Sequence, residues 1–249
     1  MPSPESAHPY VAGVVDRLLA AAAEQDTTLR SCAEQLADRV RDGGVLHVFG
    51  TGHSHIVAEE LFARAGGPAF VNPILDETLM LHAGGGLSTR AERLPGYARV
   101  VLDGHDLRPG DALLVVSNSG RNAVPVEAAL RGRELGLLTL ALTSFGHSSS
   151  VTSRHGSGQR LMDVVDVALD NRADPGDGQL ELPGSGARYG PTSTVVGTAL
   201  AQTLVCMVVE TLDGQGHTPP LIRSANLDDS DEQNRARKAP YLDRIPALR

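Results

Sequence analysis

One short polar turn, Ser117-Asn118-Ser119-Gly120-Arg121-Asn122, stands between an apolar run and a stretch with helical spacing. Alternate serines in such a turn place two hydroxyls and several backbone N–H groups on one concave surface, which suits a phosphate group. The simpler alternative is capping of the following helix by one serine or by Asn122. Because capping needs one such residue and this turn has four serine or asparagine side chains, we interpret it as a phosphate site.

A second turn, Gly50-Thr51-Gly52-His53-Ser54, also joins an apolar run to a stretch with helical spacing. Its glycines permit a tight turn, and the helix that follows offers N–H groups and a positive dipole end to an anion. The turn has neither the third glycine of a dinucleotide fingerprint nor the Gly-Lys-Ser/Thr of a P-loop, so a nucleoside triphosphate is a poor prediction. An ordinary strand-to-helix turn is the alternative.

Both turns must be positioned by a sheet, because buried apolar runs alternate with helical segments along the chain. We predict strands at 45–49, 68–72, 112–116, 137–142 and 164–169, with helices at 10–41, 56–65, 74–82, 94–102, 126–135 and 192–212. This alternation predicts one parallel sheet covered on both faces, a flavodoxin-like three-layer α/β/α sandwich. Ligands bind such sheets at the carboxyl ends of the strands, where both polar turns are expected.

Composition excludes several classes of function. Only 3% of the 249 residues are aromatic and tryptophan is absent, so aromatic stacking on bases or sugar rings is not a main device. The formal net charge is −8, and Lys238 is the one lysine, which argues against a nucleic-acid or anionic-membrane surface. We therefore predict no nucleic-acid partner and no membrane partner.

The two cysteines, Cys32 and Cys206, lie far apart inside helical patterns, which is typical of buried thiols in a reducing compartment. The apolar residues near the N-terminus are interrupted by Asp16 and Arg17, so we expect no signal peptide. No apolar run approaches the length of a membrane span. These observations predict a cytoplasmic protein.

The chain is predicted to have three parts: an N-terminal helix in 1–44, an α/β domain in 45–213 and a tail in 214–249. The helix carries an apolar stripe that either forms a dimer or packs on its own domain. The tail is rich in proline and charge, and we expect it to pack on the domain or on a partner subunit.

Three stretches together resemble one known family, the SIS (sugar isomerase) domain. They are VLHVFGTGHS, ALLVVSNSGRNAVPVEAALRGRELGLLTLALTS and PTSTVVGTALAQTLV, and the resemblance covers roughly residues 40 to 212. The family's phosphate turn reads Ser-x-Ser-Gly-x-Thr, which Ser117, Ser119 and Gly120 match, while Asn122 stands where threonine is usual. An asparagine amide can replace that hydroxyl as a donor.

The resemblance implies a sugar phosphate as ligand and a homodimer or homotetramer with sites close to subunit boundaries. We predict no cofactor. The predicted ligand-binding residues are Thr51, Gly52, His53, Ser54, Ser117, Asn118, Ser119, Gly120, Asn122 and Ser193. The stretch from Gly190 to Thr194 is also similar to N-acetylmuramic acid 6-phosphate etherase. The first of that enzyme's paired glutamates falls opposite Arg64, and the metal-ligand histidine of sedoheptulose 7-phosphate isomerase falls opposite Glu60.

Sugar-phosphate isomerisation and β-elimination both begin with removal of the proton next to a carbonyl, which needs a carboxylate or an imidazole. We predict Glu60 as this acid/base residue and Glu59 as the second choice; the alternative is a surface pair of Glu60 with Arg64. His82, just before the glycines 84–86 of a possible lid, is the other predicted catalytic residue. His55 and Glu59 are four residues apart, but two ligands do not make a zinc site, so we predict no metal.

The sequence-based prediction is therefore a lyase acting on an N-acetylated amino-sugar 6-phosphate by elimination across C2 and C3. When C2 carries an N-acetyl group, isomerisation at C2 is blocked and elimination becomes the available path. An aldose–ketose sugar-phosphate isomerase is the first alternative. A phosphosugar sensor is the second, although only about 44 residues precede the first predicted strand and they do not predict a DNA-binding domain.

Overall fold

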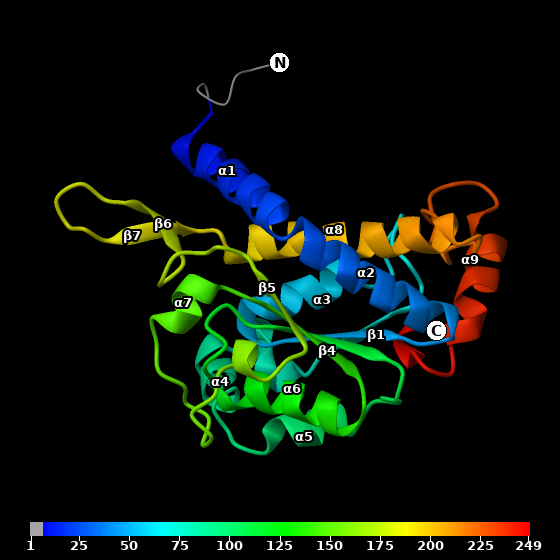
Figure 1. The fold of residues 1–249 in the computed structure, drawn as a ribbon, viewed down its shortest axis with the longest axis horizontal. Helices are drawn as coiled ribbons and strands as arrows, with labels where there is room; N and C mark the ends of the chain where they lie inside the picture. Colours follow the sequence, from blue (N-terminus) through cyan, green and yellow to red (C-terminus); the bar gives the residue numbers. More distant parts are fainter. Residues whose placement is uncertain (1–6) are drawn as a thin grey trace.

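A five-stranded parallel sheet forms the centre of the computed structural model, which describes residues 7–249 (Figure 1). Its strands are β1 (Leu46–Gly50), β2 (Val71–Ile74), β3 (Ala112–Val116), β4 (Leu138–Thr143) and β5 (Val167–Asp170). Their order in space is β2-β1-β3-β4-β5, and every neighbouring pair is parallel. This is the flavodoxin-like order, so the predicted fold class is confirmed.

Helices cover both faces of the sheet (Figure 1). One face carries α2 (Asp26–Arg41), α3 (His55–Leu61) and α8 (Ser193–Gly214), and the other carries α4 (Gly85–Ala91), α5 (Tyr97–Leu102) and α6 (Ala123–Glu134). Each face has its own apolar core. Along β3, Leu113 belongs to one core and Leu114 to the other, because successive side chains of a strand point to opposite faces.

The N-terminal segment differs from the single long helix that the spacing predicts. It forms α1 (Pro9–Glu24) and α2, which are separated at Gln25. The Gln25 side chain explains the break: its amide donates to the backbone oxygen of Asp170 (2.7 Å), and its oxygen accepts the Asp170 N–H (2.7 Å). The apolar stripe is correspondingly split, since Leu29 and Leu36 of α2 are buried whereas Val11 and Val15 of α1 are exposed.

The segment after β2 is also different from its prediction. Instead of a helix over 74–82, it forms two short 3-10 turns, Glu77–Leu79 and Leu81–Ala83. The carboxylate of Asp76 accepts hydrogen bonds from the N–H groups of Thr78 and Leu79, which fixes the first turn. The triple glycine that follows does not close a helix but opens α4, with Gly84 at φ 115°.

A hairpin and two short helices lie within segments predicted as loop or tail. A hairpin of β6 (Gly178–Glu181) and β7 (Arg188–Pro191) occupies the stretch before α8, and it projects from the domain next to α1 (Figure 1). A short helix α7 (Phe145–Ser149) follows β4, and α9 (Ser230–Lys238) lies in the C-terminal tail. The tail places Ile222, Tyr241, Ile245 and Leu248 in the core of the domain.

Helix α8 departs from the expectation that no apolar run approaches the length of a membrane span. It is the one helix in residues 7–249 that is long and apolar enough to cross a membrane, judged by length and composition alone. In the fold, α8 packs against α1, α2 and α3, and its inward-facing residues, among them Leu200 and Leu204, are buried. The buried face of α8 is therefore part of the core of the domain.

A buried ionic network closes the amino-terminal edge of the sheet. The carboxylate of Asp111 lies 3.2 Å from Nε2 of His47 and accepts hydrogen bonds from the Val45 N–H (2.9 Å) and from Arg244 of the tail (2.6 Å). Burial alone would raise the pKa of Asp111, but the hydrogen bonds from His47 and from the backbone hold it below its ordinary value. This network fixes the tail to the sheet at the edge opposite the polar turns.

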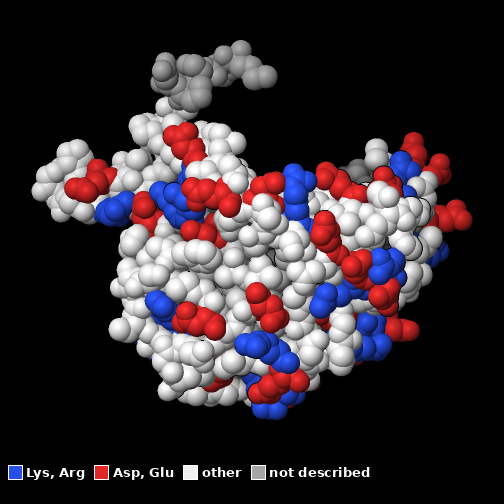
Figure 2. Space-filling view, viewed as in Figure 1, with Lys and Arg blue, Asp and Glu red and all other residues white. Residues whose placement is uncertain are grey.

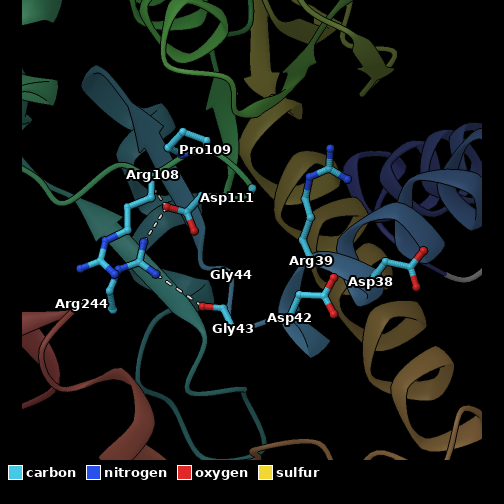
Figure 3. Close-up of a pocket in the computed structure, with 10 residues that line it drawn as sticks. Asp38, Arg39, Asp42, Gly43, Gly44, Arg108, Pro109, Asp111 and Arg244 are labelled. Carbon is cyan, nitrogen blue, oxygen red and sulfur yellow. Dashed lines mark hydrogen bonds and ion pairs between the residues drawn. The ribbon is translucent and has the colours of Figure 1, made fainter.

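The same edge holds a cavity of about 480 Å³. Figure 3 shows Arg108, Asp111 and Arg244 on one side of it and Asp38, Arg39 and Asp42 on the other. Arg108 and Arg244 pair with Asp106, and Arg41 pairs with Asp38 and Asp42, so nearly all the charges here are already balanced. Figure 2 likewise shows acidic and basic side chains interspersed over one face of the molecule, without a broad basic area.

Candidate functional site

The carboxyl ends of β1 and β3 bring the two polar turns together. These strands are neighbours in the sheet, and the order of strands reverses between them, which is where open α/β sheets bind ligands. Thr51 follows β1 and Ser117 follows β3, and both side chains are buried. The arrangement agrees with the prediction that the turns share one edge.

The turn from Ser117 to Asn122 is shaped to receive an anion. The Gly120 N–H donates to the Ser117 hydroxyl (3.2 Å), and Gly120 has φ 57°, a conformation that glycine adopts without strain. A Cβ on Gly120 would also come within 3.0 Å of Leu161. Within residues 7–249 the backbone N–H groups of Ser119, Arg121 and Asn122 form no hydrogen bond, so several donors remain available at the start of α6.

The first turn is held close to its helix by Gly50. A Cβ at this position would lie 2.5 Å from the backbone oxygen of Ser54, so no larger residue fits without moving the backbone. Residues Gly52–Ser54 form one 3-10 turn that leads into α3. Of the predicted ligand residues here, Thr51 is buried, Gly52 and Ser54 are half-buried, and His53 is exposed.

Glu92, at the end of α4, joins the two turns. One of its carboxylate oxygens accepts a hydrogen bond from the Thr51 hydroxyl (2.8 Å), and the other accepts from the Asn122 amide (2.7 Å). Burial raises the pKa of Glu92, while the Thr51 hydrogen bond and the nearby Arg93 and Arg154 partly offset that effect. A carboxylate with a raised pKa between two predicted ligand residues is a candidate acid/base group.

The sequence-based analysis missed Glu92. The only feature of the sequence that pointed to Glu92 was its position a few residues after the triple glycine, which was interpreted as part of a possible lid. The decisive contacts join residues 30 and 41 positions apart, which helical spacing does not reveal.

Asn118 is placed at the turn, but its side chain is already engaged. Its amide nitrogen lies 3.2 Å from Nδ1 of His147, and its oxygen accepts a hydrogen bond from Asn171 (3.1 Å). Burial lowers the pKa of His147, which favours the neutral ring that accepts from Asn118. Asn118 thus ties the turn to the ends of β4 and β5.

The predicted catalytic residues fall at different distances from this site. The ring of His82 contacts the ring of His55 edge-on, with 6.4 Å between centroids, which brings His82 beside the first turn. Glu59 lies 3.7 Å from Nε2 of the same His55. His82 and Glu59 therefore remain predictions for the neighbourhood of the site.

Glu60 lies elsewhere on α3. Its carboxylate pairs with Arg64 and accepts a hydrogen bond from Gln202 of α8 (3.3 Å). It lines a separate cavity of about 320 Å³ together with Arg64, Ala65, Gly66, Gly67 and Gln202. None of these residues belongs to either polar turn, so within the described chain Glu60 is not brought to the predicted phosphate site, and its catalytic role stays a prediction.

Ser193 has a local partner. Its hydroxyl donates to Asp177 (2.5 Å), and the same carboxylate accepts the N–H groups of Thr192 and Ser193. Asp177 therefore supplies the negative group at the start of α8.

Within residues 7–249 no group of three or more His, Cys, Asp and Glu side chains could hold a metal ion. The expectation that the protein needs no metal ion stays a prediction.

Comparison with known proteins identifies the family. A family model described as the SIS domain matches residues 9–144, more than half of the chain, so the protein belongs to the SIS domain family. Within it, the chain is 41% identical over 220 residues to a UPF0309 protein from Listeria monocytogenes, covering 88% of this chain and 89% of that protein. It is 38% identical over 239 residues to a UPF0309 protein from Geobacillus kaustophilus, covering 96% and 95%. The chain is thus a member of the UPF0309 group.

Among solved structures, the chain is similar to a phosphoheptose isomerase from Francisella tularensis. The TM-score is 0.55 with 16% sequence identity, and the match covers 84% of this chain and 100% of that one. This likeness shows a shared fold. The match to the family model starts at Pro9 and so includes α1 and α2, whereas the resemblance noted from the sequence began near residue 40.

Proposed function

We propose that the protein is an aldose–ketose isomerase of sugar phosphates. The observation that carries this proposal is the position of Glu92, a carboxylate with a raised pKa held 2.8 Å from the Thr51 hydroxyl and 2.7 Å from the Asn122 amide. The free N–H groups of the turn at 117–122 would bind the phosphate, and Glu92 would face the sugar carbons.

The chemistry follows from this placement. Isomerisation requires a base that takes the proton from the carbon next to the carbonyl and returns it to the neighbouring carbon. A base with a pKa nearer to neutrality performs both transfers better than an ordinary glutamate, and burial moves the pKa of Glu92 in that direction. Thr51, whose hydroxyl donates to Glu92, would hold that carboxylate in position, and His82 remains the candidate for moving the proton between O1 and O2.

Two observations favour isomerisation over the elimination predicted from the sequence. The lyase prediction depended on the stretch from Gly190 to Thr194, but the Ser193 hydroxyl in that stretch is bonded to Asp177. A solved structure that shares the fold is that of a phosphoheptose isomerase. A protein that binds a sugar phosphate without turnover is the third possibility.

Mass spectrometry and NMR of reactions in deuterated water distinguish the isomerase, the lyase and the protein that binds without turnover. We expect a panel of aldose and ketose 5-, 6- and 7-phosphates to contain a pair that interconverts, with deuterium at the carbon that receives the proton and no loss of water. Loss of water from an N-acetylated hexosamine 6-phosphate would contradict the proposal in favour of the lyase. Saturable binding across the panel without chemistry would contradict it in favour of a sensor.

We also propose a cytoplasmic homodimer or homotetramer that needs no cofactor. Burial raises the pKa of the Cys32 thiol to about 12, as suits a structural, unreactive thiol, whereas Cys206, also expected to be buried, is exposed on α8. Val11, Val15 and Leu19 form an exposed apolar line on α1, spaced four residues apart, which supports a subunit contact.

A further inference from the structure

Three arginines lie around the turn at 117–122, and the proposed chemistry uses none of them. Arg121 belongs to the turn, Arg93 follows Glu92, and Arg154 comes from the segment 150–160 between α7 and β5. None of the three forms a salt bridge within residues 7–249, although eleven other arginines do, among them Arg160 of the same segment.

The segment 150–160 is fastened to the turn by its backbone. The Arg154 N–H donates to the Arg121 oxygen (2.7 Å), and the Leu161 N–H donates to the Gly120 oxygen (2.8 Å). The Arg154 guanidinium then donates to the side-chain oxygen of Asn122 (2.9 Å). A positive charge is therefore held next to the residue whose backbone N–H is one of the free donors.

Arg121 has an unused donor in the same place. Its Nη2 donates to the Thr152 hydroxyl (3.3 Å), but its Nε is buried and has no hydrogen-bond partner within residues 7–249. A buried N–H without an acceptor costs free energy, and an acceptor supplied by a ligand would remove that cost.

The charges of this cluster match one phosphate group. Arg93, Arg121 and Arg154 contribute three positive charges and Glu92 one negative charge, so the sum is +2. A phosphate monoester carries about −1.5 to −2 charges at pH 7. Partial loss of solvent around the guanidinium and the repulsion from Arg121 and Arg93 lower the pKa of Arg154, consistent with positive charges crowded together. Without these arginines, Glu92 would repel a phosphate bound at the neighbouring turn.

We propose that Arg121 and Arg154 bind the phosphate dianion and complete the site whose floor is the turn at 117–122. The segment 150–160 thereby forms the outer wall of the phosphate site. The site becomes selective for a dianionic tetrahedral group over a carboxylate or an unphosphorylated sugar. This inference rests on the proposed function, because it places the phosphate at that turn.

Calorimetric titration with inorganic phosphate at pH 8 tests the inference. We expect Arg154→Gln and Arg121→Gln each to weaken phosphate binding about tenfold, because each removes a charge-assisted hydrogen bond. Arg154→Lys should recover part of the loss because it restores the charge. Arg160→Gln is the matched control, because Arg160 belongs to the same segment but pairs with Asp163. The affinity of this variant for phosphate should equal that of the wild type.

The thermal midpoint of each variant without phosphate separates binding from folding. Arg154 is exposed, so Arg154→Gln should unfold at the wild-type temperature while gaining less stability from added phosphate. Unchanged affinity in both glutamine variants, with binding still abolished by Ser119→Asp, would overturn this inference and leave the proposed function standing. Equal weakening in Arg160→Gln would also overturn it. If Ser119→Asp still bound phosphate like the wild type, the turn at 117–122 would not be the phosphate site.

Discussion

Replacing Glu92 by glutamine should lower kcat for sugar-phosphate isomerisation by about 10²–10⁴, the usual contribution of a general acid/base group. Glutamine keeps the size of the side chain and can still accept one of the two hydrogen bonds from Thr51 and Asn122. The phosphate donors are untouched, so the affinity for inorganic phosphate should stay within a few-fold of the wild type. The measurement is kcat and phosphate Kd for the same purified protein.

Glu60→Gln is the matched control for this variant. Glu60 pairs with Arg64 away from both turns, so its loss should leave kcat nearly unchanged. Full activity of Glu92→Gln together with loss of activity in Glu60→Gln would contradict the proposed role of Glu92. It would instead support the acid/base residue predicted from the sequence.

Glu92 also sets the expected pH dependence of the activity. A base must be ionised, and burial raises the pKa of Glu92 above its ordinary value of 4.5. Activity should therefore be full at neutral pH and fall as the pH is lowered through the raised pKa, with the midpoint of kcat/KM above 4.5. A profile that stays flat down to the ordinary value would argue against Glu92.

The second large effect is expected from Ser119→Asp. The new carboxylate would stand at the turn where the N–H groups of Ser119, Arg121 and Asn122 have no partner among the described residues, and it would both occupy these donors and repel a phosphate. We expect phosphate and sugar-phosphate affinity to fall at least about a hundredfold, which corresponds to about 3 kcal/mol.

A serine far from the site provides the control for this charge. Ser31 is exposed on α2, and Ser31→Asp adds the same negative charge on the outer surface of the domain. Its phosphate affinity should be close to that of the wild type. Equal affinity of Ser119→Asp and Ser31→Asp would show that the turn is not where phosphate binds.

The sheet and the two turns could be predicted from the sequence because their signals are local. Apolar runs such as 112–116 mark buried parallel strands, and such strands bring their carboxyl ends to one edge. Thr51 and Ser117 were therefore placed at one site without knowledge of any contact between them. Glycines at special positions, such as Gly50 and Gly120, added the shape of the turns.

The rest depended on contacts between distant parts of the chain. The break between α1 and α2 is set by Gln25, which binds Asp170, a residue 145 positions away. Glu92 enters the site because α4 begins at the glycines near 84–86, where the pattern predicted the end of a helix. Arg154 lies in a segment without periodicity, so nothing local indicated that its side chain reaches Asn122.

The central claim is that the turn at 117–122 binds the phosphate group of the substrate. The most direct measurement is a titration of ¹⁵N-labelled protein with inorganic phosphate, followed by the NMR signals of the backbone amides. We predict saturable shifts of the amides of Ser119, Arg121 and Asn122, which have no hydrogen-bond partner within residues 7–249. Shifts confined to Gly43, Gly44 and Gly110, at the cavity on the opposite edge of the sheet, would contradict it (Figure 3).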